Sequence, residues 1–233
     1  MKFARVLLGI LFLVPFSSAV ESEETNAIYS ILNADILINA DMWSEQPQIL
    51  AAGLGFTEII GVPNLSTNQP AVSETLTRLA GGTWNTPTCA NEDTGLYAHT
   101  SAATPGAIRP LYGKAVYFAD GLPVEFSWPV LPSSVSPQNF RITLNNGVSV
   151  YPEVASIWPN FEYNERSTVV LFGYFGNRMS DQEEGAIYPV SLEIVEGESS
   201  LVLVGPAQFL FDATGLSIEM PGSPYSSEQP IPS

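Results

Sequence analysis

The sequence predicts a mostly antiparallel β protein, best described as a β-sandwich with minor short helices. From residue 114 onward, short runs of alternating apolar and polar residues are separated by turn residues, and the chain contains 18 glycines and 19 prolines. Such spacing is typical of sandwiches and barrels. Asn146-Gly147 stands between two alternating runs and is a strong hairpin signal, because both central positions of the turn need positive φ. Helical patterns are scarce, which argues against a parallel α/β sheet.

Residues 1–19 predict a cleavable secretory signal peptide. Lys2 and Arg5 precede an apolar run that Pro15 ends, and small residues lead up to Ala19, which is the order of a signal peptide. The alternative is a membrane anchor, but a spanning helix needs about 20 apolar residues, and this run is much shorter. We therefore expect a secreted, extracellular protein that is cleaved near Ala19 and has no membrane span.

Residues 20–112 are expected to form an N-terminal region that is β-rich or mixed. Four apolar runs lie in its first half, at residues 27–32, 36–38, 49–52 and 59–62. Short runs of this kind fit a strand or a helix, and periodicity alone does not decide between them. Residues 73–80 precede a Gly81-Gly82 pair and predict a short helix, since glycine readily takes the positive φ found at helix C-termini. The stretch up to residue 113 is expected to be a loop, whose length indicates either a function or unrecognised strands.

Residues 113–220 are expected to form the sandwich, and the Pro/Ser-rich residues 221–233 a disordered tail. Strand patterns recur along the sandwich region, at residues 115–118, 124–128, 140–144, 148–151, 169–172, 190–194, 201–204, 209–211 and 216–220. Asp120-Gly121 is expected to be a turn between the first two runs. A sandwich buries alternate residues of two facing sheets, as these runs predict. Whether the N-terminal region is a second domain stays open.

Residues 122–172 resemble the Ig-like modules of secreted and cell-surface bacterial proteins. The resemblance is carried by a strand ending in a Pro turn at Val124–Val130, a Phe that opens the next strand in Val135–Leu144, and the Asn146-Gly147 hairpin. Such modules serve as spacers or binding scaffolds and carry no catalytic motif, so the resemblance implies a non-catalytic role. The insertion Trp158–Arg166 is longer and more aromatic than a plain module needs, which leaves room for a site.

The chain is acidic, with 24 acidic and 8 basic residues and a net charge of −16. An acidic surface repels phosphate backbones, so we expect no nucleic-acid partner, and it disfavours anionic membranes for the same reason. Its simplest role is solubility. The single cysteine, Cys89, forms no intramolecular disulfide and is expected to be buried and inert or paired with another chain. Asn64-Leu65-Ser66 is a sequon that is glycosylated only in a eukaryotic host.

Two classes of function fit these features. The first is a secreted, non-catalytic binding or interaction protein, as the Ig-like resemblance implies, whose partner is an unknown protein or a small apolar ligand. The second is an extracytoplasmic small-molecule enzyme of the isomerase or cyclase type acting on an apolar substrate, because such chemistry needs only a shaped pocket and one or two polar groups. Its candidate catalytic residues are His99, Tyr163, Glu165 and Arg166. The candidate binding residues, for which a packed aromatic corner is the alternative, are Trp158 and Phe161.

No cofactor is expected, and calcium is the one ion that the sequence leaves open. One histidine and one cysteine nearly exclude a zinc site, and His99 is either a general base or a loop histidine without chemistry. Residues 91–93 and 181–185 concentrate oxygen ligands of the kind that calcium prefers, although ordinary solvated acidic loops explain them as well. A calcium-stabilised structural protein is therefore the third hypothesis. The core is expected to contain Trp43, Trp84 and Trp128.

Overall fold

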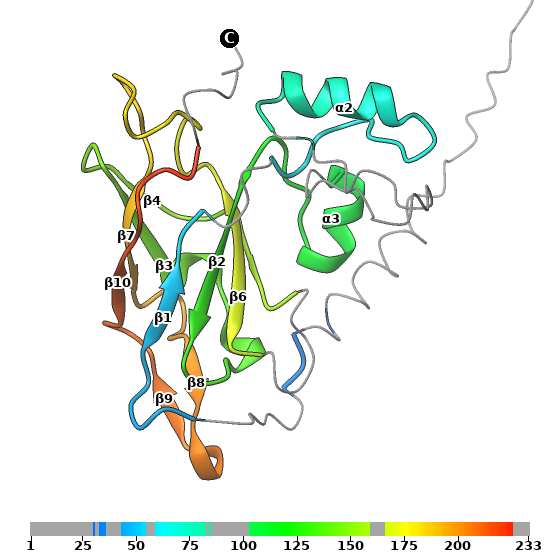
Figure 1. Cartoon of the computed structure of the whole chain (residues 1–233). Coiled ribbons are helices and arrows are strands. Elements are labelled where there is room, and N and C mark those ends of the chain that lie inside the picture. Colours follow the sequence, from blue (N-terminus) through cyan, green and yellow to red (C-terminus); the bar gives the residue numbers. More distant parts are fainter. Residues whose placement is uncertain are drawn as a thin grey trace, which may run out of the picture.

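The computed structural model describes residues 30, 33–35, 43–54, 59–82, 84, 103–158 and 166–225 of the 233-residue chain. Within these residues the chain forms ten β-strands, two α-helices and three short 3₁₀ turns. The paired strands are antiparallel, and they form two four-stranded sheets and one two-stranded sheet. The predicted class, mostly antiparallel β with minor helices, is confirmed (Figure 1). The signal peptide predicted over residues 1–19 lies outside the described residues.

The first sheet has the strand order β1-β2-β6-β5. Its strands are β1 (Ile49–Ala52), β2 (Asp120–Phe126), β6 (Thr168–Gly173) and β5 (Val154–Ser156). In the central pair, Val124 of β2 lies opposite Val169 of β6, and both side chains are fully buried. The turn expected at Asp120-Gly121 is wrong, because these residues open strand β2 and pair with the end of β6.

The second sheet has the strand order β10-β7-β3-β4. Its strands are β10 (Ser217–Glu219), β7 (Pro189–Ile194), β3 (Phe140–Leu144) and β4 (Ser149–Val150). The hairpin predicted from Asn146-Gly147 joins β3 to β4. The Gly147 N–H donates to the Leu144 carbonyl over 2.9 Å, and Gly147 has a φ of +83°. Glycine suits this position because residues with a Cβ rarely adopt such a φ.

Both four-stranded sheets contribute side chains to one hydrophobic core. Leu122 and Leu171 of the first sheet, and Ile142 and Leu192 of the second, belong to this core and are fully buried. In β3, Ile142 is buried while its neighbour Arg141 is partly exposed, as the alternating pattern predicts. Fully burying a leucine or isoleucine side chain stabilises the fold by about 1.5–3 kcal/mol, so the shared core holds the two sheets together.

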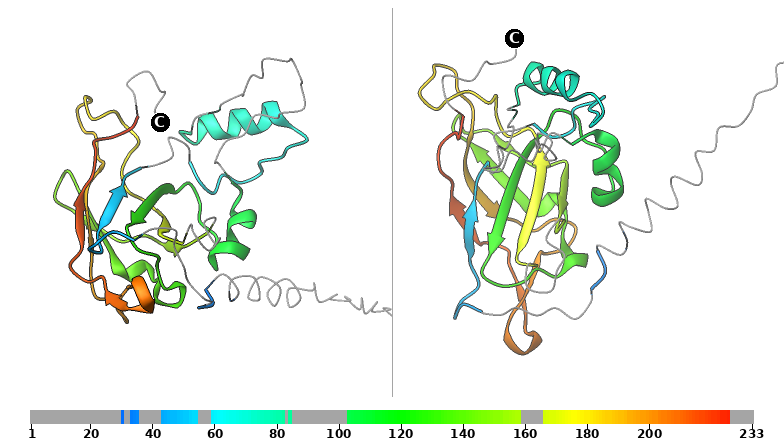
Figure 2. Two further views of the ribbon diagram at one scale, coloured as in Figure 1. Left: turned by 60° about the horizontal axis from the view of Figure 1, so that its bottom comes forward. Right: turned by 45° about the vertical axis from the view of Figure 1, so that its right-hand side comes forward.

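The third sheet is a hairpin formed by β8 (Val202–Val204) and β9 (Leu210–Asp212). It lies in the connection between β7 and β10 and projects beyond the end of the two larger sheets (Figures 1 and 2). Leu203 of β8 reaches the shared core. Trp128 belongs to that core and Trp43 packs against it, which confirms the expectation for these two residues, and Trp84 is half-buried.

Helix α2 (Pro70–Leu79) contains most of the helix predicted over residues 73–80. Proline stands at its first position, where the missing N–H has no helical partner to lose. Gly81, which follows the helix, has a φ of +89°, as the Gly pair predicts. The half-buried Leu76 of α2 packs against Ile59 and Val62 in a small separate cluster.

Helix α3 (Pro105–Tyr112) replaces part of the expected long loop, which is therefore wrong for these residues. Thr104 caps the helix with its side chain, and Gly113 ends it in the left-handed conformation. Pro110 lies inside the helix. Because proline normally breaks helices, the sequence pattern does not predict this one. Tyr112 contacts Phe172 of β6 with ring centroids 4.6 Å apart, within a second hydrophobic cluster between α3 and the first sheet.

The first residues of the expected disordered tail, 221–225, instead pack against the loop that precedes β7. Tyr225 is 4 % exposed. The Ser223 hydroxyl donates to the Met179 carbonyl over 2.6 Å. Residues 226–233 lie outside the described residues.

Candidate functional site

Of the residues predicted to be catalytic or to bind an apolar ligand, the structure describes Trp158 and Arg166. Arg166 is 5 % exposed, and its backbone carbonyl accepts the Val130 N–H over 2.8 Å. Trp158 is half-buried and packs against the second hydrophobic cluster. The other members of the predicted set lie outside the described residues, namely His99, Phe161, Tyr163 and Glu165, and with them Cys89. A catalytic or ligand-binding role for these residues stays a prediction.

Asn64, the predicted glycosylation residue, is exposed on the turn that precedes α2. Its φ is +64°, a conformation that asparagine tolerates better than most residues. Ser66 of the sequon donates its backbone N–H to the Ser73 hydroxyl oxygen over 2.8 Å, which ties this turn to the helix. Asn64 is therefore on the surface, and its glycosylation stays a prediction.

The acidic stretch Asp181–Gly185, one of the two predicted calcium loops, uses two of its three carboxylates for hydrogen bonds within or next to the loop. Glu183 Oε2 accepts the Ser180 N–H over 3.2 Å, and Asp181 Oδ1 accepts a hydrogen bond from the Gln182 side chain over 3.1 Å. Across the described part of the chain, no three His, Cys, Asp or Glu side chains gather in a way that could hold a metal ion. The other loop, residues 91–93, lies outside the described residues, and calcium binding stays a prediction.

One end of the molecule is formed by residues 127–139 and 195–216, which together we call the hairpin end. The first segment connects β2 to β3, and the second connects β7 to β10 and contains the β8–β9 hairpin. Two backbone hydrogen bonds, of 2.9 and 2.7 Å, join residues 129–131 to β8. The hairpin is thereby attached along one edge to the body of the molecule.

Two tryptophans anchor the base of the hairpin. The Trp128 Nε1–H donates to a backbone carbonyl over 2.9 Å, and its ring meets Phe211 of β9 edge-on at a centroid distance of 6.1 Å. Gly205 lies so close to this ring that a Cβ there would come within 2.5 Å of Trp128 Cζ3. The Trp43 Nε1–H donates to the Val204 carbonyl over 3.1 Å. The base of the hairpin is therefore held by specific contacts on both β8 and β9.

The tip of the hairpin is strained and apolar. Ala207 and Gln208 have φ values of +56° and +62°, as in a type I′ turn, where Asn-Gly is the usual pair. Such a conformation costs a non-glycine residue on the order of 1–3 kcal/mol. The next two residues, Phe209 and Leu210, are 59 % and 58 % exposed, and residues 199–211 carry no charged side chain. The hairpin end thus presents an uncharged apolar tip on an anchored base.

Asp212 supplies a carboxylate next to this tip. Its Oδ1 accepts the Thr214 N–H over 2.9 Å, and its Oδ2 accepts the Ser200 hydroxyl over 2.8 Å. These hydrogen bonds, above all that from the Thr214 backbone, lower the pKa of Asp212, because they stabilise the charged form. Asp212 is exposed and carries a negative charge at neutral pH.

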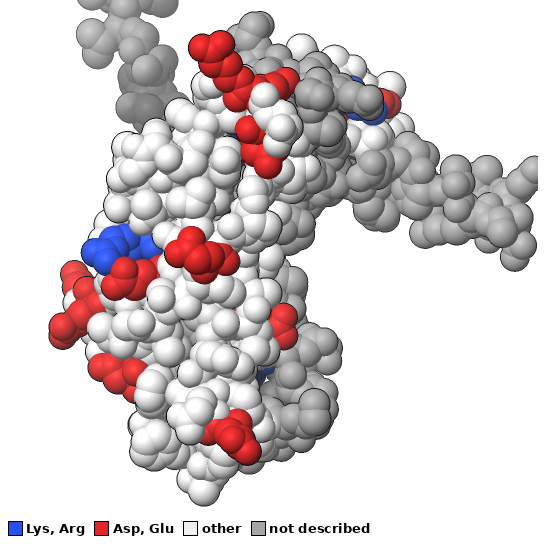
Figure 3. Space-filling model, turned by 60° about the vertical axis from the view of Figure 1, so that its left-hand side comes forward, with Lys and Arg blue, Asp and Glu red and all other residues white. Residues whose placement is uncertain are grey.

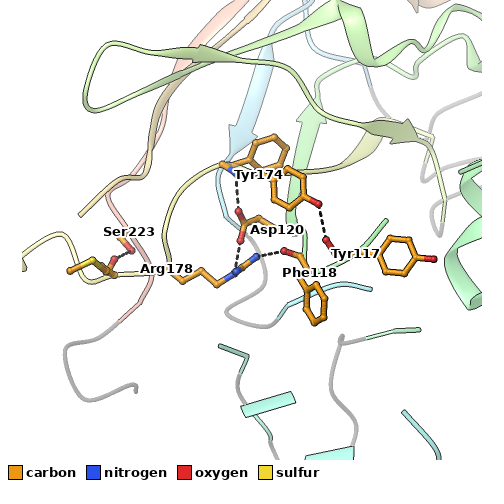
Figure 4. Close-up of polar contacts among 8 residues, drawn as sticks. Tyr117, Phe118, Asp120, Tyr174, Arg178 and Ser223 are labelled. Atoms are coloured by element: carbon orange, nitrogen blue, oxygen red, sulfur yellow. Dashed lines mark hydrogen bonds and ion pairs between the residues drawn. The ribbon is translucent and has the colours of Figure 1, made fainter. Parts of the chain in front are cut away.

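A second candidate surface lies at the opposite end of β2, around a buried ion pair (Figure 4). The Asp120 side chain is 1 % exposed, and the Arg178 Nε lies 2.8 Å from its Oδ1. This close contact is an ion pair. The other carboxylate oxygen accepts the Phe175 N–H over 2.8 Å, and the Arg178 guanidinium also donates to the Phe118 carbonyl over 2.7 Å.

The ion pair stabilises two unfavourable backbone conformations. Phe118 and Arg178 have φ values of +50° and +58°, and each costs on the order of 1–3 kcal/mol. Burial raises the pKa of Asp120, while the charge of Arg178 and the Phe175 N–H act in the opposite direction. Through its contacts with Asp120 and Phe118, Arg178 joins the start of β2 and the segment before it to the loop after β6.

Exposed aromatic side chains surround this ion pair. Tyr117, Phe118 and Tyr174 are 52 %, 44 % and 54 % exposed. The Tyr174 hydroxyl donates to the Tyr117 carbonyl over 2.9 Å (Figure 4), so this ring is used to hold the adjoining segment in place. The hairpin tip projects from the body, whereas Tyr174 of this second surface is engaged in a hydrogen bond to the neighbouring segment, so we regard the hairpin end as the stronger candidate for binding.

Sequence patterns miss both of these surfaces. They predict a turn at Asp120 and an ordinary strand over residues 209–211. For the tip, the available signal is the uncharged run 199–211 in so acidic a chain. The buried pair leaves no signal, because Asp120 and Arg178 are far apart in the sequence.

Comparison with known proteins adds no relative. No family model, curated protein or solved structure matches the chain. Among the residues that the structure describes, no helix has both the length and the apolar character needed to cross a membrane.

Proposed function

We propose that this chain is a secreted, non-catalytic binding protein with an Ig-like β-sandwich fold, and that it binds its partner through the hairpin end. The strand order supports the fold. In Ig sandwiches, strands A-B-E-D form one sheet and G-F-C the other, and variable-type domains add C′ beside C. In chain order, β1-β2-β6-β5 correspond to A-B-E-D, and β10-β7-β3-β4 correspond to G-F-C-C′. The β8–β9 hairpin is then an insertion in the F–G connection.

This correspondence supports a binding role for the hairpin end. In variable domains the B–C and F–G connections lie at the same end and form part of the binding site. Their counterparts here are residues 127–139 and 195–216, which backbone hydrogen bonds join. The chain has a single cysteine, so apolar packing takes the place of the inter-sheet disulfide of antibody domains.

The observation that carries the proposal is the exposed apolar tip. Phe209 and Leu210 are more than half exposed on the projecting hairpin, next to the two strained residues Ala207 and Gln208. Binding hot spots combine large side chains with rigid support, and backbone strain concentrates at functional sites. Fully burying a phenylalanine or leucine contributes about 1.5–3 kcal/mol, which is the size of a hot-spot contribution.

The chemistry of the tip favours binding over catalysis. Residues 206–210 are Pro, Ala, Gln, Phe and Leu, and none of these side chains titrates near neutral pH or acts as a nucleophile. They can therefore offer contact surface but no proton transfer, which general acid–base catalysis requires.

Site-specific photo-crosslinking tests the proposal. A photoreactive amino acid replaces Phe209 in one sample and Val148, which is 51 % exposed on the β3–β4 turn, in the control. After irradiation in the extracellular fluid of the producing cells, we expect a discrete adduct from position 209 and none from position 148. Equal adducts from both positions would contradict the proposal. So would turnover of a substrate by the purified protein that a single point substitution abolishes.

A further inference from the structure

The two edges of the β8–β9 hairpin differ in their backbone partners. Residues 129–131 close the outer edge of β8 through hydrogen bonds with Val202 and Val204. β9 pairs with β8 in a two-stranded sheet, and no other segment of the described chain pairs with β9. With respect to the residues that the structure describes, the hairpin therefore has one closed edge and one open edge.

The register identifies the groups that face the open edge. Phe209 and Ala213 form backbone hydrogen bonds of 2.7 and 2.9 Å with the β8 side of the hairpin, so odd-numbered residues turn their backbone groups toward β8. In an antiparallel pair, the residues between them direct their N–H and C=O groups away from the partner strand. The backbone groups of Leu210 and Asp212 thus face outward, and both residues are exposed.

We propose that the open edge of β9 binds an extended, basic and apolar peptide segment of a partner protein, which adds as a third strand to the β8–β9 sheet. This inference rests on the proposed function and names the class of partner. Strand addition gains affinity from main-chain hydrogen bonds and specificity from alternate side chains. An apolar side chain of the peptide lies beside Leu210 and a Lys or Arg beside Asp212, because cross-strand neighbours on one face interact directly.

Charge favours a basic segment as the occupant. Residues 195–216 contain three acidic residues and no basic one, and residues 127–139 contain no charged residue. On the face shown in Figure 3, acidic groups are spread from one end to the other, while basic groups gather at few points. Complementary charge speeds association and suppresses wrong partners. The same acidity opposes a second copy of this chain, since two chains of net charge −16 repel each other.

Size favours a strand over a globular surface. A stable interface between globular proteins involves roughly 20–30 residues on each side. The tip and the open edge expose only residues 206–210 and Asp212. A strand needs no larger area, because its backbone hydrogen bonds supply much of the affinity.

A random-peptide display library is the probe that tests this inference. It is selected on the wild-type protein, and the selected peptides are compared on variants by fluorescence anisotropy. Leu210→Pro removes one outward N–H, a change that edge strands tolerate, together with the leucine side chain, and should weaken binding roughly tenfold or more. Asp212→Asn should reduce both the preference for Lys and Arg and the salt dependence. Val148→Ser, on the β3–β4 turn, should bind as the wild type does.

N-methylation of the selected peptides separates strand addition from other modes of binding. Two sets of peptides are made, each methylated on alternate backbone nitrogens. In the first phase of methylation the methyl groups face β9, and in the second phase they face solvent. We expect peptides of the first phase to bind roughly tenfold more weakly or worse, and peptides of the second phase to keep their affinity. This comparison uses the unmodified protein, so it stays decisive if Leu210→Pro unfolds the hairpin.

Several outcomes would overturn strand addition. These are the failure to select any peptide, equal loss in both N-methyl phases, peptide binding that a folded Leu210→Pro variant retains, and self-association of the chain through β9 in sedimentation. If a photo-adduct still forms at position 209 in any of these cases, the proposed function stands and the strand-addition inference fails. If the adduct is missing as well, both fail.

Discussion

Replacing Arg178 by methionine removes the charge that neutralises the buried Asp120. Methionine keeps much of the apolar stem of arginine but lacks the guanidinium. Two described contacts are lost, the 2.8 Å ion pair with Asp120 and the 2.7 Å hydrogen bond to the Phe118 carbonyl. Of the contacts described for Asp120, the Phe175 N–H at 2.8 Å remains. In the variant, the buried Asp120 carboxylate therefore keeps one hydrogen-bond donor but loses its positively charged partner.

The burial of both partners sets the size of the effect. The side chains of Arg178 and Asp120 are 15 % and 1 % exposed, so solvent screens the pair very little. Removing one partner of a buried pair costs about 3–5 kcal/mol, because the other charge stays buried. At about 2–4 °C per kcal/mol for a domain of this size, we expect the melting temperature to fall by roughly 6–20 °C.

The effect should depend on pH in a definite direction. Burial raises the pKa of Asp120 above its unfolded value, and Arg178 opposes this rise, so the pKa of Asp120 should rise further in the Arg178→Met variant. A group whose pKa is raised by folding contributes stability that is fully present below its unfolded pKa. This stability is lost as the pH rises through the folded-state pKa. The destabilisation by Arg178→Met should therefore be larger at neutral pH and shrink as the pH falls toward about 4.

Denaturant titrations followed by circular dichroism, at neutral pH and near pH 4, measure these changes in the free energy of unfolding. Arg141→Met is the matched control, because Arg141 pairs with Glu193 while both side chains are about 40 % exposed, and exposed pairs contribute little. The double variant Asp120→Asn/Arg178→Met removes both charges and should recover part of the loss. Equal destabilisation by Arg178→Met and Arg141→Met, or a loss that grows on acidification, would refute the reasoning.

Three further substitutions test other parts of the structure. Gly205→Ala should destabilise the protein by about 1–3 kcal/mol, because its Cβ meets the Trp128 ring at 2.5 Å. Its control, Gly106→Ala in α3, has its nearest neighbouring atom 4.0 Å away and should be neutral or stabilising in thermal melts. Ile142→Ala should lower the free energy of unfolding by about 2–5 kcal/mol, since Ile142 is fully buried, and a loss below about 1 kcal/mol would contradict a shared core. Asn64→Gln should increase the electrophoretic mobility of protein secreted by eukaryotic cells through loss of one glycan, and unchanged mobility would exclude that glycan.

Local patterns predict the strands of the second sheet and one turn correctly. The alternation in β3 follows from the two-residue period of a strand, and the positive φ at Gly147 follows from the Asn-Gly pair. The sequence also predicts α2 through the glycines that follow it. Each of these features depends on residues that are close in the sequence, which is why they can be predicted.

Local patterns fail where a distant contact decides the conformation. Pro110 indicates a break, yet α3 continues through it, because Tyr112 packs on Phe172 of β6. Asp120-Gly121 has the composition of a turn, yet it opens β2, because the carboxylate is paired with Arg178 and the backbone pairs with β6. Neither partner can be identified from residues nearby in the sequence.

The hairpin end combines features that the local sequence predicts with features that distant contacts decide. By itself, the sequence determined an acidic chain with one cysteine, many short strands and an uncharged run over residues 199–211, since composition and period are local properties. Only the tertiary structure decided that this run becomes a projecting hairpin with an exposed tip and one open edge. Trp43 holds Val204 across a separation of 161 residues, and the register of β9 decides which backbone groups face outward. Contacts over such separations are selected by the packing of the whole chain and not by the properties of neighbouring residues.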